Sequence, residues 1–351
     1  MSNFKAVFTL KQHTPIIHFQ ANQNGATLRA TELKPKFDKF LKKYIFNNQI
    51  PKEYKISDKD ALSYKVKVYA TNTKTINFEK YPPLYFARDS KQKLLSDSIT
   101  VEFTSFNTKL ISTIKENFES FLANENFGTR QSKGYGNFYI DEKDFNPNLV
   151  KRKKTYFFYS DKNNWEKDIK LFYGFLRAGI NEIDFRTKTS KFYAKSLMFL
   201  YASSLQIVWD KKAIKEHFFN HKEPKRHHLM KDLLGLSANE SWLSYKMSLK
   251  KSSKNIDRYK SPITFKPIQE AKRVKIYLFA DEINKNFLDS FFQIKGKGKP
   301  LNISTPKEFD IYKFLSFAFK TNLDEHIDKK YHNNKNFTKL QDIFTTLKAQ
   351  I

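Results

Sequence analysis

The stretch FGTRQSKGYGNFYI, residues 127–140, contains three of the nine glycines of the chain within nine residues. Glycine lets backbone N–H groups come close to a bound phosphate, because no side chain stands in the way. Arg130 and Lys133 lie between the glycines and would supply positive charge for the same phosphate. The alternative is a tight turn in which the first glycine caps a helix and the other two reverse the chain.

The composition favours a polyanionic partner. The 351 residues include 64 Lys plus Arg against 36 Asp plus Glu, a formal net charge of +28. Self-repulsion of this size is usually offset by a partner such as nucleic acid. The 35 Phe and 18 Tyr provide flat rings on which bases can stack. The alternative is a composition set by AT-rich coding, in which the additional lysines only solvate the surface.

The same composition excludes several classes of site. The chain has no cysteine, so disulfides, thiolate nucleophiles and cysteine-based zinc sites are ruled out. No apolar run approaches the roughly 18 residues that a membrane span requires. We therefore expect a cytoplasmic protein without membrane contact, cofactor or bound metal.

Histidines provide the other candidates for chemistry. His13 and His18 lie near the first predicted strand and could act as general acid or base in RNA cleavage, although a histidine at a sheet edge is more often structural. His217 and His221 have the spacing of two metal ligands on a helix, but a solvated basic surface is the expected alternative. The KGKGK stretch, residues 295–299, lacks P-loop spacing and indicates a flexible basic loop.

Apolar periodicity places the glycine stretch within a series of predicted elements. The series consists of a strand around residues 6–10, a helix over 33–44 that begins no later than Pro35, strands at 64–70 and 99–104, a helix over 107–122, and a strand at 137–140. This order is the ferredoxin-like arrangement, which RNA-recognition modules share. The glycine stretch then lies between the second helix and the fourth strand.

The remainder of the chain is predicted to be mixed. After the basic run at 151–154 come a strand at 155–159, helical stripes through Trp165–Leu176 and Phe192–Leu200, a linker at 248–260, strands at 263–265 and 274–280, and helices near 307–319 and 336–347. The segment SPITFKPI at 261–268 loosely echoes HTPIIHFQ at 13–20. We predict an α+β fold: a ferredoxin-like domain at 1–150, a mainly helical insertion at 151–260, and a second, diverged sheet region at 261–351.

Several of these stretches resemble the RAMP superfamily of CRISPR effector subunits. GTRQSKGYG at 128–136 is similar to the family's glycine-rich loop, G-x-R-x-x-[KR]-G-[FY]-G. TPIIHF at 14–19 and TLRATELKPKFDKFL at 27–41 resemble its first strand and the opening of its first helix, and HHLMKDLLGLS at 227–237 resembles its LFG-type segment. The chain looks most like the Cmr-type subunit that caps type III complexes, although that branch usually has Lys-Gly where this chain has Lys34-Pro35.

The resemblance implies a non-catalytic, RNA-binding subunit of a type III CRISPR ribonucleoprotein. Its partners would be guide RNA, or the duplex of guide with target RNA, and other effector subunits. Some members cut target RNA with an aspartate after the first strand, but here that loop, ANQNG at 21–25, contains no acid. The residues predicted to contact RNA are Arg29, Lys34, Lys65, Lys67, Tyr69, Gly128, Arg130, Gln131, Lys133, Gly134, Tyr135 and Gly136.

Two other functions remain open at this stage. One is a stand-alone, metal-independent endoribonuclease of the same superfamily that processes precursor guide RNA with His13 or His18. Such enzymes usually carry the glycine loop close to the C-terminus, whereas here the loop ends at Gly136 of 351 residues. The other is a basic RNA-binding module unrelated to CRISPR.

Overall fold

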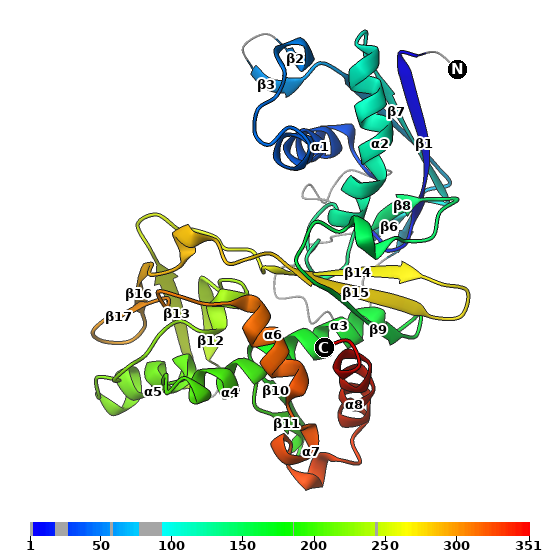
Figure 1. Cartoon of the computed structure of the whole chain (residues 1–351). Coiled ribbons are helices and arrows are strands. Elements are labelled where there is room, and N and C mark those ends of the chain that lie inside the picture. Colours follow the sequence, from blue (N-terminus) through cyan, green and yellow to red (C-terminus); the bar gives the residue numbers. More distant parts are fainter. Residues whose placement is uncertain (1–2, 18–26, 57–58, 77–92, 185, 243–244) are drawn as a thin grey trace. The chain divides into compact units, whose positions relative to one another are not determined.

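A computed structural model describes residues 3–17, 27–56, 59–76, 93–184, 186–242 and 245–351 (Figure 1). The chain divides into two compact units. Unit 1 combines Met1–Thr155 with Phe265–Tyr277, and unit 2 combines Tyr156–Thr264 with Leu278–Ile351. Within the described ranges, no helix is long and apolar enough to cross a membrane.

Unit 1 is built on a four-stranded sheet with the order β4-β7-β1-β8, in which all neighbours are antiparallel. Its strands are β1 (Lys5–Gln12), β4 (Lys65–Thr71), β7 (Ser98–Thr104) and β8 (Phe138–Ile140), and its two long helices are α1 (Ala30–Tyr44) and α2 (Thr108–Asn124). The chain order of these elements is strand, helix, strand, strand, helix, strand, as the sequence predicts.

An aromatic core joins both helices to one face of this sheet. The ring of Phe37 on α1 lies 5.7 Å from Phe103 on β7 and 5.4 Å from Phe118 on α2. Phe8 on β1 lies 4.6 Å from Phe118. Ala6, Phe8 and Leu10 therefore face the helices, because side chains alternate along a strand, and their neighbours on β1 face the opposite side.

The first helix begins earlier than its proline suggests. The carbonyl of Arg29 accepts the N–H groups of Glu32 and Leu33, so α1 starts at Ala30. Pro35 therefore lies inside the helix. The sequence suggests a position in the first turn instead. The exposed ring costs this helix one backbone hydrogen bond, and the buried stripe of Leu33, Phe37 and Leu41 maintains the helix around it.

Smaller elements complete unit 1. Two short hairpins, β2 (Lys55–Ile56) with β3 (Lys59–Leu62) and β5 (Lys74–Ile76) with β6 (Lys93–Leu95), were not predicted. The strands β14 (Ile263–Gln269) and β15 (Val274–Ala280) are hydrogen-bonded neighbours, and their connecting end, Phe265–Tyr277, belongs to unit 1. The sequence predicts these residues in a separate region at 261–351.

Unit 2 contains the remaining helices and strands. The helices are α3 (Trp165–Arg177), α4 (Leu197–Ser204), α5 (Asp210–Asn220), α6 (Ile311–Lys320), α7 (Leu323–His326) and α8 (Lys335–Lys348). The strands are β9 (Thr155–Ser160), β10 (Ile180–Ile183), β11 (Ser190–Ala194), β12 (Asn239–Trp242), β13 (Met247–Ser252), β16 (Phe291–Lys295) and β17 (Leu301–Ser304). Phe172, Phe319 and Phe344 form the contact between α3, α6 and α8.

Residues 151–260 contain more strand than the predicted helical insertion. They include the pairs β10-β11 and β12-β13 beside their three helices. Phe192 lies on β11 and not on a helix, and Ser196 is the N-cap of α4, where its Oγ accepts the N–H of Phe199 at 3.1 Å. The predicted linker at 248–260 begins inside β13, because the buried position of Lys251 hides the alternation of that strand.

Candidate functional site

The face of the unit 1 sheet opposite α1 and α2 carries a regular array of side chains. The strand register places Lys65, Thr104 and Lys5 in one cross-strand row. The next rows are Lys67 with Glu102 and Val7, and Tyr69 with Thr100 and Thr9. The predicted residues Lys65, Lys67 and Tyr69 therefore share one face, and β1 adds Lys5 to it.

This face is open to solvent on β4 and on β1. Tyr69 is 51% exposed and Val7 is 52% exposed, values that a packed sheet face would not allow. The acid on the face, Glu102, is paired with Lys5 at 2.8 Å, which leaves Lys65 and Lys67 to provide unbalanced positive charge. Thr104 lies between Lys65 and Lys5, and Thr100 and Thr9 lie in the row of Tyr69. We refer to this set, Lys5, Val7, Thr9, Lys65, Lys67, Tyr69, Thr100, Glu102 and Thr104, as the open sheet face.

The glycine stretch uses its glycine N–H groups inside the protein. Gly128 donates to Glu32 Oε1 at 2.8 Å, and Gly136 donates to the carbonyl of Pro15 at 2.8 Å. Gly134 donates to the carbonyl of Gln131 at 3.3 Å. These three groups stabilise the local fold, so a phosphate contact at this stretch would not use the glycine N–H groups.

Steric crowding explains why two of these positions are glycine. Gly128 and Gly136 have φ angles of +76° and +64°. A Cβ atom at Gly136 would lie 2.0 Å from the carbonyl oxygen of Phe127, and one at Gly128 would lie 2.5 Å from that of Ile17. Both distances are far below van der Waals contact, so the loop requires glycine for its own conformation.

Two segments that are distant in the sequence form hydrogen bonds with the glycine stretch. Before it in the sequence, the carbonyls of Pro15 and Ile17 accept N–H groups of the stretch. From β14, the N–H of Phe265 donates to the carbonyl of Ser132 at 3.2 Å, and the Asn137 side chain donates to the carbonyl of Pro267. Pro15 and Ile17 belong to the first of the two similar sequences, and Phe265 and Pro267 belong to the second, so described residues of both contact this loop.

Asn126 and Lys36 connect the stretch to the rest of unit 1. Asn126 Nδ2 donates to the carbonyls of Gln131, at 2.7 Å, and Phe265, at 2.9 Å. Lys36 Nζ donates to Gln131 Oε1 at 2.8 Å and lies 3.1 Å from Glu32 Oε1. The side chain of Gln131 is therefore held by α1, although the sequence predicts it as an RNA contact.

Lys266 is a fully buried lysine that contacts Asn126 of this network. Its Nζ donates to the carbonyl of Glu125 at 3.0 Å and to Asn126 Oδ1 at 3.1 Å. Burial lowers the pKa of Lys266 to about 7; Glu125 opposes the shift, and the positive charges of Arg152 and Lys36 add to it. No pattern in the sequence indicates this position, because a lysine between apolar residues of a strand is usually exposed.

The remaining predicted contacts occupy different environments. Lys34 is held by Asp38 Oδ2 and the carbonyl of Leu62, both at 2.9 Å, and lies over the ring of Tyr64. Arg29 is the half-buried N-cap of α1, and Tyr135 is buried. Arg130 has a φ of +58° and is partly exposed. Lys133 is partly exposed as a residue, but its Nζ is buried.

His13 is buried and bonded to the backbone. Its Nδ1 accepts the N–H of Gln269 at 3.1 Å, and its own carbonyl accepts Gln269 Nε2 at 2.7 Å. Burial, with the nearby charges of Lys266 and Lys11, lowers the pKa of His13 to about 3. This ring is neutral near pH 7 and fixed by structural contacts. His18, the other catalytic candidate, lies outside the described residues.

The two candidate surfaces lie at different edges of the sheet. Lys65, Lys67 and Tyr69 are on the edge strand β4, whereas the glycine stretch leads into β8 at the other edge. Three strand spacings separate the two edges, about 14 Å. An RNA strand contacting both would have to cross the sheet.

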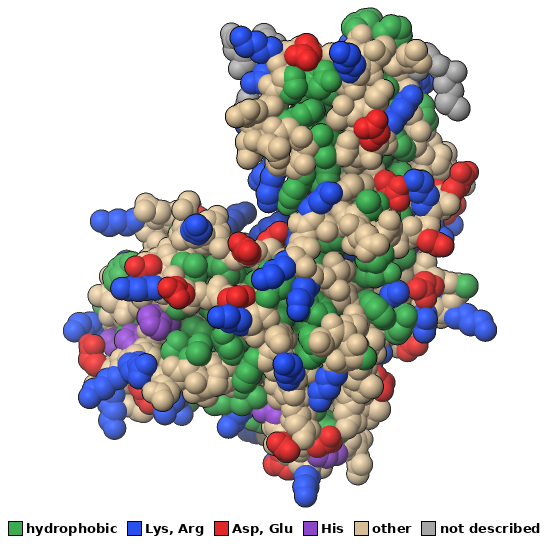
Figure 2. Space-filling view, in the orientation of Figure 1, with side chains coloured by type: hydrophobic (Ala, Val, Ile, Leu, Met, Phe, Trp, Pro, Cys, Tyr) green, Lys and Arg blue, Asp and Glu red, His purple; other side chains and the backbone are tan. Residues whose placement is uncertain are grey.

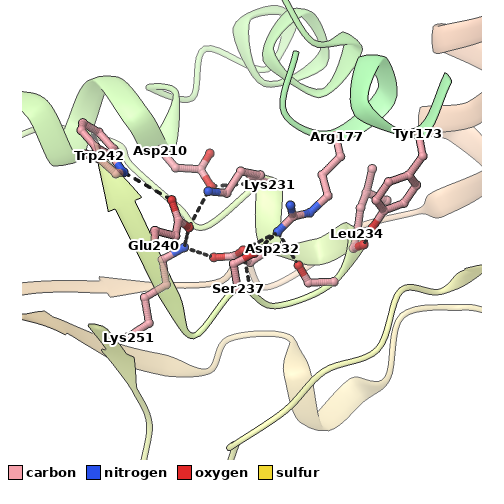
Figure 3. A network of polar contacts seen from close by, with 11 residues as sticks. Tyr173, Arg177, Asp210, Lys231, Asp232, Leu234, Ser237, Glu240, Trp242 and Lys251 are labelled. Atoms are coloured by element: carbon pink, nitrogen blue, oxygen red, sulfur yellow. Dashed lines mark hydrogen bonds and ion pairs between the residues drawn. The ribbon is translucent and has the colours of Figure 1, made fainter. Parts of the chain in front are cut away.

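Unit 2 contains a second group of charged residues, which is buried (Figure 3). Lys251 Nζ lies 2.5 Å from both Asp232 Oδ2 and Glu240 Oε1, and Lys231 Nζ lies 2.5 Å from Glu240 Oε1. Arg177 lies 3.2 Å from Asp232 Oδ1. Lys231 and Asp232 come from the segment at 227–237 that resembles the LFG-type motif.

The charged side chains of this group shift one another's pKa values. Burial alone would lower the pKa of Lys251, but Asp232 and Glu240 raise it to about 12. Burial raises the pKa of Asp210 to about 6, with an added contribution from Asp232. Because Lys251 and Asp232 have fully buried side chains, we assign the group to the stability of unit 2 and not to ligand binding.

The histidine pair on α5 does not converge on a metal site. His217 Nε2 lies 2.8 Å from the carbonyl of Lys299, and His221 is the exposed C-cap of the helix. Over the described part of the chain, no three side chains from His, Asp and Glu cluster as metal ligands would.

Two family models cover most of the sequence. Residues 3–180 match the Cmr1 N-terminal domain, and residues 193–349 match the Cmr1 C-terminal domain. The chain belongs to the Cmr1 family. This match confirms the predicted resemblance to RAMP subunits of Cmr-type, type III CRISPR complexes.

Solved structures of Cmr1-family and Cmr proteins give weaker similarities. The crystal structure of apo Cmr1 from Pyrococcus furiosus shares 12% identity and a TM-score of 0.43, over 80% of this chain and 89% of that one. A chain of the Type III-B Cmr-beta structure bound to cognate target RNA shares 10% identity and a TM-score of 0.30. That match spans 40% of this chain and 59% of the other. No curated protein matches the sequence.

Proposed function

We propose that this Cmr1-family chain is a non-catalytic RNA-binding subunit of a type III CRISPR ribonucleoprotein, and that it contacts guide RNA or the guide–target duplex through backbone phosphates. The observation that carries the proposal is the open sheet face. It combines unbalanced lysines, an exposed tyrosine and hydroxyl groups on three adjacent strands of unit 1.

The chemistry of this face suits an RNA strand. Lys65 and Lys67 project from the same side of β4, two residues and therefore about 6.6 to 6.8 Å apart along the strand. This separation is comparable to the length of one nucleotide in an extended chain, so each ammonium group can meet a successive phosphate. Tyr69 is the next residue of β4 on the same side, and its ring can stack on a base. Threonine hydroxyls can bond to ribose.

The arrangement of unit 1 supports a ferredoxin-like fold. In the order β4-β7-β1-β8, the first strand of the unit lies between the third and the fourth, and the second strand is at the edge. Both helices pack on one face and leave the other accessible. RNA-recognition modules use the same open face to bind RNA.

A structural role for His13 supports the non-catalytic part of the proposal. A general base needs a pKa near the working pH and access to substrate. His13 is 6% exposed, with its pKa lowered to about 3, so it meets neither condition. The loop at 21–25, in which related subunits place a catalytic aspartate, lies outside the described residues.

Changing the charge of the open sheet face should weaken RNA binding. In the variant Lys65→Ala/Lys67→Ala, we expect the slope of log K against log salt for single-stranded RNA to fall by about 1.4, because each phosphate contact contributes about 0.7. Tyr69→Ser should cost about 1 to 3 kcal/mol of stacking at any salt concentration. Fluorescence anisotropy with a labelled RNA of mixed sequence measures both effects.

The matched control is Lys39→Ala/Lys43→Ala, which removes the same charge from exposed positions of α1 on the other side of the sheet. This variant should keep nearly the wild-type slope, apart from a small change due to net charge. Equal slopes for the two double variants would show that RNA does not contact the open sheet face.

A further inference from the structure

One end of unit 2 collects basic side chains from two distant parts of the sequence. Six exposed residues lie in the loop after α5, at the end of β16 and in the turn that follows it: Lys222, Lys225, Arg226, Lys295, Lys297 and Lys299. We call these six residues the basic edge. Figure 2 shows lysine, arginine and histidine side chains gathered over the part of unit 2 that carries α5 and β17 in Figure 1.

Contacts between the two segments hold the basic edge together. His217 on α5 places its Nε2 2.8 Å from the carbonyl of Lys299, and Lys299 Nζ lies 3.9 Å from Glu223 Oε1. The turn also packs closely on the helix, since a Cβ atom at Gly296 would lie 3.0 Å from the ring of Phe218. The six basic residues therefore belong to one surface, even though about 70 residues separate the two segments in the sequence.

The two segments contain little acid to balance this charge. Glu223 is the one acidic residue in the sequences HKEPKR at 221–226 and KGKGK at 295–299. Its pair with Lys299 has side chains 80% and 83% exposed, so water and salt screen it strongly. The mutual repulsion of the remaining basic side chains would be relieved by a bound polyanion.

The composition of the surface favours RNA over a protein or a membrane. Neither segment contains an aliphatic or aromatic side chain apart from Pro224, which is buried. Protein interfaces have an apolar or aromatic centre, and membrane-bound segments insert apolar side chains. Phosphate binding needs only flexible cations and exposed backbone, and both are present here.

We propose that the basic edge is a second RNA-binding surface, which contacts backbone phosphates independently of base sequence. The proposal takes its ligand class from the proposed function but rests on separate residues in the other unit. It also gives an RNA-binding role to residues 221–226, which lie within the predicted insertion at 151–260.

The test is a triple variant of the intact chain, Lys222→Ala/Lys225→Ala/Lys297→Ala. All three side chains are exposed. We expect the salt slope for single-stranded RNA to fall by about 2, with weaker binding to every sequence tested. The control Lys313→Ala/Lys329→Ala/Lys335→Ala removes the same charge from exposed sites elsewhere in unit 2. Tryptophan fluorescence checks that both variants are folded.

The outcomes separate this proposal from the previous one. If the basic-edge variant binds RNA with the slope and affinity of its control, while Lys65→Ala/Lys67→Ala is impaired, the second surface is refuted and the proposed function stands. If the basic-edge variant alone is impaired, the second surface is supported and the open sheet face is not. If the wild-type chain does not bind RNA, both proposals fail.

Discussion

Replacing Lys251 with methionine should lower the free energy of unfolding of unit 2 by about 3 to 5 kcal/mol. The ammonium group of Lys251 neutralises two carboxylates, Asp232 and Glu240, each 2.5 Å away. Methionine has a similar shape but no charge, so the variant leaves three buried acids facing two bases. An uncompensated charge in a buried site costs more than the lost contact alone.

The neighbouring residue provides a matched control. Lys250 precedes Lys251 on β13 but is exposed, so Lys250→Met should change stability by about 0.5 kcal/mol or less. The double variant Lys251→Met/Asp232→Asn restores the balance of charge and should recover part of the loss. The three tryptophans of the chain, Trp165, Trp209 and Trp242, all belong to unit 2, so urea titration followed by their fluorescence reports on this unit. Equal destabilisation by the Lys250 and Lys251 variants would contradict this role of the buried charges.

Unit 1 should become more stable as pH rises above 7, because of Lys266. Its pKa is about 7 in the folded protein, against an ordinary value of 10.5. Below pH 7 the ammonium form is present in both states, and its burial lowers stability in full. Between pH 7 and 10.5 the unfolded chain binds the additional proton, so the free energy of unfolding rises by up to about 1.4 kcal/mol per pH unit.

This effect is measured as a difference between wild type and Lys266→Met. Between pH 7 and pH 9, we expect the free energy of unfolding of wild type to rise by about 2 to 3 kcal/mol more than that of the variant. Hydrogen exchange of α2 peptides, compared at each pH, reports the opening of unit 1 and cancels the intrinsic pH dependence of exchange. The control is Lys272→Met, which changes an exposed lysine of the same hairpin. Its free energy of unfolding should differ from that of wild type by the same amount at each pH. A constant difference for Lys266→Met as well would show that this lysine keeps its proton when buried.

The sequence predicts the framework of unit 1 because each element has a strong period. The stripe from Leu110 to Leu122 lies within α2, and the alternation around Phe8 corresponds to β1. The short hairpins escape prediction because strands of two to four residues have too few side chains for a period. In unit 2, β13 is concealed by Lys251, whose burial depends on acids from other segments.

The candidate site is predictable where exposure follows from strand alternation. Lys65, Lys67 and Tyr69 appear as a polar face in the sequence and share that face in the structure. Lys34 and Gln131 are also polar, but their contacts with Leu62 and Lys36 arise only from the tertiary fold. The return of residues 265–277 to unit 1 is also a tertiary feature, which no local pattern specifies.

Photo-crosslinking tests the central proposal most directly, because it locates RNA on the protein. Single-stranded RNA containing 4-thiouridine is bound to the intact chain, irradiated, and the crosslinked peptides are identified by mass spectrometry. We expect crosslinks on the open sheet face, with Tyr69 of β4 as the main site and loss of that signal in Tyr69→Ser. Crosslinks confined to the outer surfaces of α1 and α2, with none on β1, β4 or β7, would contradict the proposed RNA-binding role of this face.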